Sequence, residues 1–192
     1  MPKVRADGWF HATNRATDRF NLFQTTPEMA AFVDALAEAA HRFAVEIHAY
    51  CVMSSHYHVL ARAEEAELSE ALATLRPDAA ARLPRPRLCR LAFGRHLVNV
   101  TTYIHLNPVA AQVVLAAEDW PWSSYRGYLD RLEAPHWLRS DAVLGWLGPI
   151  GARLRYREKV EKKTFARPFD EELTYLCQSS MFKTYENDGA VG

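Results

Sequence analysis

Apolar and polar residues alternate with two different periods along the first part of the chain. Residues 9–15 alternate large apolar with polar side chains, which predicts a strand. Residues 27–43 repeat apolar residues at helical spacing and follow two threonines, so a capped helix is expected there. Residues 45–52 and 56–62 are extended stretches separated by a three-residue turn, which predicts a hairpin. The expected order is therefore strand, helix and hairpin.

The second part of the chain continues this order with a further helix, strand and helix. Proline marks two expected helix ends, because it cannot continue the helical hydrogen bonds. The expected elements are a helix at 68–75, a proline- and arginine-rich connection at 81–87, a strand at 88–93, a helix from Gly94 to Asn107 ended by Pro108, and helices at 140–147 and 152–163. This pattern predicts an α+β fold, a ferredoxin-like plait with a mainly antiparallel sheet and packed helices.

Length and composition fit one compact domain with a small appendage. The chain has 192 residues, of which 49% are hydrophobic. No apolar run approaches the roughly 18 residues of a membrane span, and the polar start of the chain lacks the apolar core of a signal peptide. Cys51, Cys89 and Cys177 are widely separated and odd in number. We therefore expect a cytoplasmic protein without a disulfide framework.

The formal net charge is zero, but the charges are unevenly distributed. Residues 79–117 contain no Asp or Glu, and the arginines of this span are Arg82, Arg85, Arg87, Arg90 and Arg95. A basic patch of this kind can guide a polyanion even on a neutral protein. A second basic run at 153–163 is as well explained by an ordinary solvated face. The first span is thus the candidate nucleic-acid surface.

Two small groups of residues carry possible chemistry. His56 and His58 lie two apart on a predicted strand, so they project from one face and could chelate a divalent metal ion. Tyr103 and Asn107 lie one turn apart on the polar side of a predicted helix. Each group alone also has a structural interpretation: buried histidines bonded to their neighbours, and a core-edge tyrosine followed by a helix-ending asparagine.

Taken together, these groups resemble the HUH single-tyrosine transposases, in the branch associated with repetitive extragenic palindromes. Four motifs occur in the family's order: 10–15 (FHATNR), 49–60 (AYCVMSSHYHVL), 103–109 (YIHLNPV) and 120–125 (WPWSSY). The resemblance covers at least residues 9–130, so a catalytic domain at 1–130 and a helical extension at 131–192 are expected. The sequence departs from the family at Ser54 and Ser55, where Pro-Asn is usual, and in a shortened arm at residues 71–87.

The resemblance implies a role for each group. Tyr103 would attack a phosphodiester of single-stranded or hairpin DNA and form a 5′-phosphotyrosine. His56, His58 and Asn107 would hold Mg²⁺ or Mn²⁺. The expected DNA contacts are Arg15, Arg87, Arg90 and Arg95. A hydrogen-bonded structural role is expected for His11, and a surface or DNA-side position for His105. Trp120 and Trp122 could stack on unpaired bases, but a Trp-Pro-Trp segment more often anchors a loop in the core.

Two other functions and two oligomeric states remain open from the sequence. One alternative is a DNA-hairpin-binding module that has lost cleavage. The other is a metal phosphoesterase that uses activated water and leaves Tyr103 structural. The protein is expected to act as a monomer or a homodimer, without a membrane partner.

Overall fold

The computed structural model describes residues 7–16, 21–75, 85–163 and 169–182. The first elements are β1 (Gly8–Arg15), α1 (Thr26–Arg42), β2 (Glu46–Val52), β3 (His56–Ala63), α2 (Glu65–Thr74), β4 (Arg87–Leu91) and α3 (Arg95–Ala110). They are followed by α4 (Tyr125–Leu129), α5 (Asp141–Leu144), α6 (Ala152–Glu161) and α7 (Phe169–Phe182). Part of the shortened arm, residues 76–84, lies outside the described residues.

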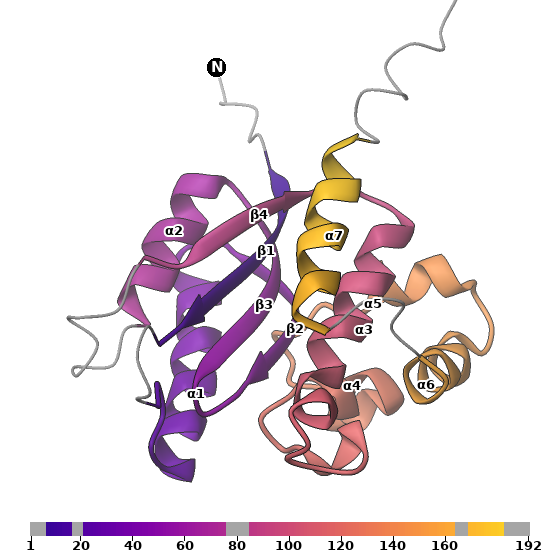
Figure 1. Cartoon of the computed structure of the whole chain (residues 1–192). Helices are drawn as coiled ribbons and strands as arrows, with labels where there is room; N and C mark the ends of the chain where they lie inside the picture. The colour runs from indigo at the N-terminus through magenta and orange to yellow at the C-terminus, as the bar shows by residue number, and fades with distance from the viewer. Residues whose placement is uncertain (1–6, 17–20, 76–84, 164–168, 183–192) are drawn as a thin grey trace, which may run out of the picture.

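The four strands form one sheet in the order β2-β3-β1-β4, and every neighbouring pair is antiparallel. With α1 and α2 in the connections, this order is that of the ferredoxin-like plait, so the predicted fold class is confirmed. Helices α1 and α2 cover one face of the sheet, and α3 and α7 lie over the other (Figure 1). The molecule therefore has helices on both faces of a single sheet.

Local sequence explains how α1 begins and packs. The side chain of Thr25 accepts a hydrogen bond from the Glu28 amide, and the Glu28 carboxylate accepts one from the Gln24 amide. This reciprocal capping satisfies amides that the first helical turn leaves unpaired. From the buried side of α1, the Phe32 ring contacts Tyr57 of β3 at 4.8 Å between centroids. The odd-numbered residues of β3 thus face α1, and the even-numbered ones face α3.

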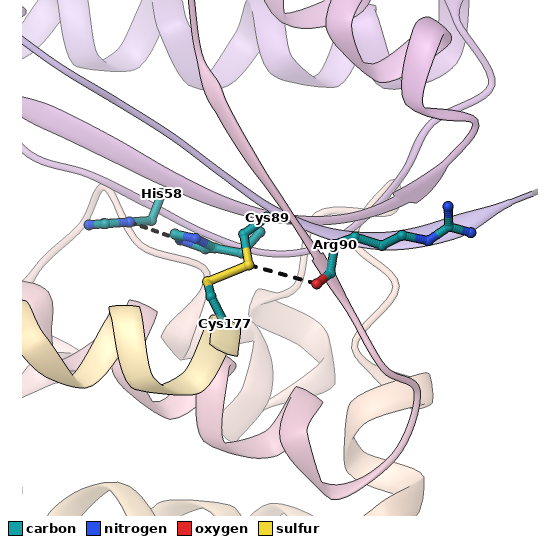
Figure 2. The surroundings of a disulfide bond; sticks show 5 residues. His58, Cys89, Arg90 and Cys177 are labelled. Atoms are coloured by element: carbon teal, nitrogen blue, oxygen red, sulfur yellow. Dashed lines mark hydrogen bonds between the residues drawn. A yellow bond between two sulfur atoms is a disulfide. The ribbon is translucent and has the colours of Figure 1, made fainter. Parts of the chain in front are cut away.

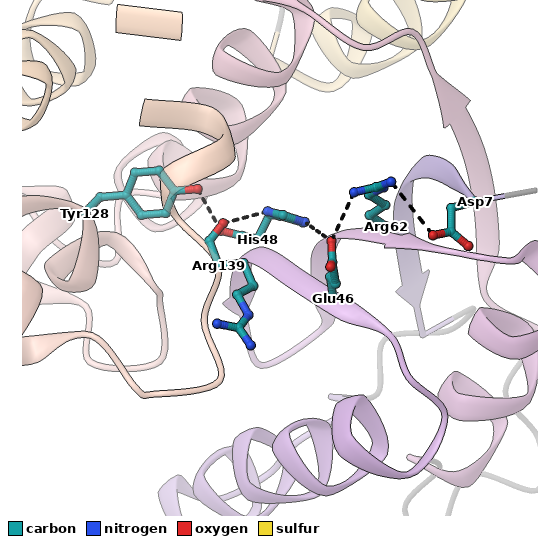
Figure 3. Close-up of polar contacts among 6 residues, drawn as sticks. All are labelled: Asp7, Glu46, His48, Arg62, Tyr128 and Arg139. Atoms are coloured by element: carbon teal, nitrogen blue, oxygen red, sulfur yellow. Dashed lines mark hydrogen bonds and ion pairs between the residues drawn. The ribbon is translucent and has the colours of Figure 1, made fainter. Parts of the chain in front are cut away.

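The outer edge of β2 is covered by the segment that follows α3. The Val52 amide donates to the Trp122 carbonyl at 2.8 Å, and the Trp120 indole donates to the Val52 carbonyl at 2.9 Å. The expectation that both tryptophans anchor a loop is confirmed. At the other end of β2, His48 bonds to the Arg139 carbonyl while the Tyr128 hydroxyl donates to the His48 carbonyl (Figure 3). An edge paired in this way does not attract a foreign strand.

Helix α3 continues past Pro108 to Ala110, so the prediction that it ends at Asn107 is wrong. It begins directly after Gly94, whose φ of +129° favours glycine. Pro108 has no amide hydrogen to donate to the Ile104 carbonyl. The side-chain amide of Asn107 lies 3.5 Å from that carbonyl and 3.0 Å from the Tyr103 carbonyl, to which it donates. A side chain thus compensates for the missing backbone bond.

His105 is buried, so its expected position at the surface or beside DNA is wrong. One ring nitrogen lies 2.6 Å from the Tyr156 hydroxyl of α6, and the other lies 2.8 Å from the Ser124 hydroxyl. Burial lowers the pKa of His105 to about 3, and the imidazole is therefore neutral at neutral pH. The sequence of α3 does not indicate this burial, because the helix that covers His105, α6, lies much later in the chain.

The expectation that the chain lacks a disulfide is also wrong. Cys89 of β4 and Cys177 of α7 are bonded to each other, with a sequence separation of 88 residues (Figure 2). Cys51 is free and buried. No helix in the described part of the chain is both long and apolar enough to cross a membrane.

We predict that His105 makes the fold sensitive to acid. Its pKa is lowered in the folded protein, so unfolding takes up a proton between about pH 6.5 and pH 3 and stability falls as pH drops through that window. His105→Gln should remove about one proton from this uptake. The free energy of unfolding should then fall less steeply with decreasing pH, by up to about 1.4 kcal/mol per pH unit. Urea unfolding at about pH 5 and about pH 7 measures the change. His136→Gln, at an exposed position, is the matched control; an equal flattening in both variants would contradict the prediction.

Candidate functional site

The structure places His56 and His58 on the face of β3 that lies under α3. Their ring centroids are 5.0 Å apart, and the side chains are buried, at 6% and 4% exposure. The register pairs His58 with Thr13 and His56 with Arg15 of β1, and directly paired residues share a face. Two imidazoles therefore stand side by side on a rigid strand in the middle of the fold.

Asn107 reaches this histidine pair from α3. Its Oδ1 lies 3.1 Å from Nε2 of His56. The amide orientation is fixed from the other side, because Nδ2 donates to the Tyr103 carbonyl of the same helix. The Nδ1 atom of His56 lies 3.0 Å from the Ser55 hydroxyl. Because an amide oxygen only accepts, Nε2 of His56 donates to Asn107, and the Ser55 hydroxyl then donates to Nδ1.

His58 is held by a third histidine, which the sequence analysis treated as structural. Nε2 of His11 lies 2.9 Å from Nδ1 of His58, so the predicted hydrogen bond of His11 is confirmed. Burial lowers the pKa of His58 well below its usual value, and the neighbouring His11, His56 and Arg15 lower it further. Burial alone lowers the pKa of His11 to about 3. Both rings are thus neutral near pH 7.

Tyr103 lies beside the histidines and is itself covered. Its ring meets His58 edge-on at 5.5 Å between centroids, and its side chain is 3% exposed. Phe169, the first residue of α7, stacks on the Tyr103 ring at 4.3 Å with an interplanar angle of 15°. Sequence reasoning missed Phe169, because no local pattern indicates that a residue so far along the chain returns to the tyrosine. In this arrangement a polymeric substrate does not reach the Tyr103 ring.

The four arginines expected to contact DNA are exposed, but they do not share one surface. Arg15 is paired with His56, and Arg87 is paired with Thr13, so both lie on the histidine face of the sheet. Arg90 is paired with Phe10 and lies over its ring at 5.8 Å, on the opposite face. Arg95 begins α3. The structure therefore separates Arg87 from Arg90, which the sequence had grouped.

His48 and Cys51 of β2, the strand next to β3, do not join the site. His48 sits at an irregularity in β2 and bonds to the Arg139 carbonyl, with its ring against Trp9. Cys51 is paired with His58, but it is fully buried, and burial raises the pKa of its thiol. Neither residue offers a reactive group to the space between the histidines and Tyr103.

The donor set at the histidine pair fits a divalent cation. Two neutral imidazoles and one amide oxygen converge from β3 and α3, which leaves coordination positions for phosphate or water oxygens. Within the described ranges, no group of three or more His, Cys, Asp or Glu side chains is arranged to hold a metal. Any site here therefore depends on the amide of Asn107 as its third protein donor.

The fold of the chain is similar to that of a solved tyrosine transposase. A similar solved structure is that of a REP-associated tyrosine transposase bound to a REP hairpin. It superposes with a TM-score of 0.56 at 21% sequence identity, covering 72% of this chain and 88% of that one. At this identity the likeness shows the shared fold. No family model and no curated protein sequence matches the chain.

We predict that Phe169 is the principal cover of the Tyr103 ring. Phe169→Ala removes the stacked ring, so nitration of Tyr103 by tetranitromethane should become severalfold faster, as measured by peptide mass spectrometry. Tyr128 and Tyr156, both at 0% exposure, serve as internal references that stay unreactive. Phe93→Ala, at an exposed phenylalanine on another part of the surface, is the control variant. Unchanged Tyr103 labelling in Phe169→Ala would show that other groups bury the ring.

Proposed function

We propose that the protein is a metal-dependent endonuclease and strand transferase that acts on single-stranded DNA folded into hairpins. The observation that carries this proposal is the meeting of Tyr103 and Asn107 of α3 with His56 and His58 of β3. These four residues are those that the resemblance to single-tyrosine transposases assigns to catalysis. The shared fold with a REP-associated tyrosine transposase supports the same reading.

Tyr103 is the nucleophile in this proposal. Its phenol oxygen forms a bond to phosphorus while the bond from phosphorus to the 3′ oxygen breaks. The products are a 5′-phosphotyrosine and a 3′-hydroxyl. The leaving 3′ oxygen takes up the proton that the phenol loses. Attack by a 3′-hydroxyl on the phosphotyrosine reverses the step and rejoins DNA without a nucleotide cofactor. Cleavage and transfer thus use one chemistry in both directions.

His56, His58 and Asn107 would hold Mg²⁺ or Mn²⁺ next to the scissile phosphate. A phenol with an ordinary pKa near 10 is a weak nucleophile at neutral pH. The bound ion supplies charge stabilisation to the phosphoryl oxygens. In this proposal β3 sets the separation of the two imidazoles, and α3 carries both Asn107, which contacts His56, and Tyr103, which contacts His58.

DNA reaches Tyr103 in this proposal only after α7 moves away from α3. The Phe169 ring occupies the face of Tyr103, and the Cys89–Cys177 bond ties the same helix to β4. While this cover is in place, the Tyr103 side chain is buried and out of reach of DNA. The exposed Arg15 and Arg87 lie on the histidine face, and in this proposal they would contact phosphates along the same path.

The burial of Tyr103 also favours a second candidate, a DNA-hairpin-binding module without cleavage. A chain that only binds DNA has no need to expose its tyrosine. The water-using metal phosphoesterase remains the third possibility, since it needs the histidines but not Tyr103. A covalent protein–DNA adduct on a denaturing gel separates the three, because only the proposed enzyme forms one.

We predict that Tyr103→Phe abolishes both the adduct and the cleavage of single-stranded hairpin DNA in the presence of Mn²⁺. The substitution removes one oxygen and keeps the ring that stacks on Phe169, so the protein should fold and bind DNA with unchanged affinity. Tyr175→Phe, at a 44% exposed tyrosine of α7, is the control and should cleave at the parent rate. Cleavage by Tyr103→Phe without an adduct would favour the phosphoesterase instead.

We predict that Arg87 and Arg90 differ in their effect on DNA binding. Arg87→Ala should weaken binding to hairpins of any sequence and reduce the slope of log K against log salt by about 0.7–0.9, the effect of one lost phosphate contact. Arg90→Ala, three residues away on the opposite face, should leave both quantities unchanged. Fluorescence anisotropy over a salt series measures the two variants. Equal losses from both would mean that DNA does not follow the histidine face.

A further inference from the structure

A buried hydrogen bond between two imidazoles joins β1 to β3 at His58, one of the candidate metal ligands. Nε2 of His11 lies 2.9 Å from Nδ1 of His58, and the two rings are nearly parallel, with centroids 5.1 Å apart. His11 is 1% exposed. It lies on the same face of β1 as Thr13, the residue paired with His58, so it approaches His58 diagonally across the strands.

The polar partner of His11 differs from those of the other buried histidines. His48 bonds to a backbone carbonyl, and His105 bonds to two hydroxyl groups. A hydroxyl can exchange the donor and acceptor roles at little cost, but two neutral imidazoles must agree on which ring carries the shared proton. The His11–His58 bond therefore links the tautomers of the two rings.

Only one of the two arrangements lets His58 serve as a ligand through Nε2. If His11 donates its Nε2 hydrogen, Nδ1 of His58 is the acceptor and Nε2 of His58 carries a hydrogen, which leaves no lone pair there for a cation. If His58 donates from Nδ1, its Nε2 has a free lone pair, and His11 accepts with its own proton on Nδ1. Partners of this kind commonly fix the tautomer and ring orientation of metal-bound histidines.

We propose that His11 is a positioning residue, which accepts the Nδ1 hydrogen of His58 and so presents Nε2 of His58 to the divalent cation. This inference rests on the proposed metal site and deepens it. The residue acts through His58 and does not touch the substrate. This role also explains why His11 occupies a position in the middle of the sheet. An apolar side chain would fill the same volume at a lower desolvation cost.

Two substitutions in the full chain test the proposal. His11→Gln places an amide oxygen close to the position of Nε2 and can still accept from His58, whereas His11→Leu fills the space and cannot. Binding of Mn²⁺ alone, followed by electron paramagnetic resonance without DNA, should weaken about 10–100-fold in His11→Leu and recover to within a few-fold of the parent in His11→Gln. His48→Gln, at another buried histidine, is the control and should bind Mn²⁺ as the parent does. Equal Mn²⁺ affinity in His11→Leu and the parent would overturn the role of His11.

NMR spectroscopy of the parent protein tests the role of His11 even if His11→Leu does not fold. In the parent protein loaded with Mg²⁺, the nitrogen-15 NMR spectrum should show the shared hydrogen attached to Nδ1 of His58, with coupling across the bond to Nε2 of His11. A hydrogen attached to Nε2 of His11 would refute the proposal. Both experiments omit DNA, so they test the role of His11 separately from the proposed function. A protein that binds Mn²⁺ through this pair yet forms no adduct would contradict the proposed function and still support the role of His11. A parent protein that binds no Mn²⁺ would overturn both.

Discussion

Helix α3 is enclosed by the sheet on one side and by α6 and α7 on others, so its polar side chains must find partners inside the protein. A buried polar group without a hydrogen bond costs on the order of 1–3 kcal/mol, which makes this requirement strict. The hydroxyls of Thr101 and Thr102 return to carbonyls of their own helix. His105 bonds outward to Ser124 and Tyr156, while Asn107 bonds both to its helix and to His56. These bonds fix the rotation of α3, and with it the side on which Tyr103 lies.

The local patterns of the sequence predicted the sheet well. Alternation predicted β1, and the hairpin signal predicted β2 and β3, with ends within two residues of those observed. The threonine-proline start of α1 was also predicted correctly. These elements follow from side-chain periodicity and capping, which depend on near neighbours alone. The end of α3 was missed because the proline rule considers only the lost backbone bond. It does not account for a side-chain amide that approaches the carbonyl left free, as Asn107 does.

For the candidate site too, local sequence predicted some features and missed those that depend on distant segments. The shared face of His56 and His58 and the common side of Tyr103 and Asn107 could be read from spacing. The bond from His11 to His58 depends on the register between two strands that are 47 residues apart, and no local signal fixes that register. The stacking of Phe169 on Tyr103 and the burial of His105 under α6 have the same cause, namely packing by segments that arrive from the far end of the chain. The sequence therefore indicated which residues could form the candidate site, but not which residues cover or orient them.

The disulfide divides the chain into a closed loop and an open remainder. Residues between Cys89 and Cys177 form a covalent ring that contains all of α3, whereas β1 and the β2–β3 hairpin lie outside it. In the chain-entropy account, closing a loop of this size restricts the unfolded ensemble by about 4–5 kcal/mol. That restriction acts within the ring, so the tyrosine belongs to the covalently constrained part of the molecule and the histidines belong to the part that noncovalent packing alone retains. In a domain that unfolds as one unit, oxidation and reduction of this pair would change the stability of the whole candidate site while leaving each of its side chains chemically unaltered.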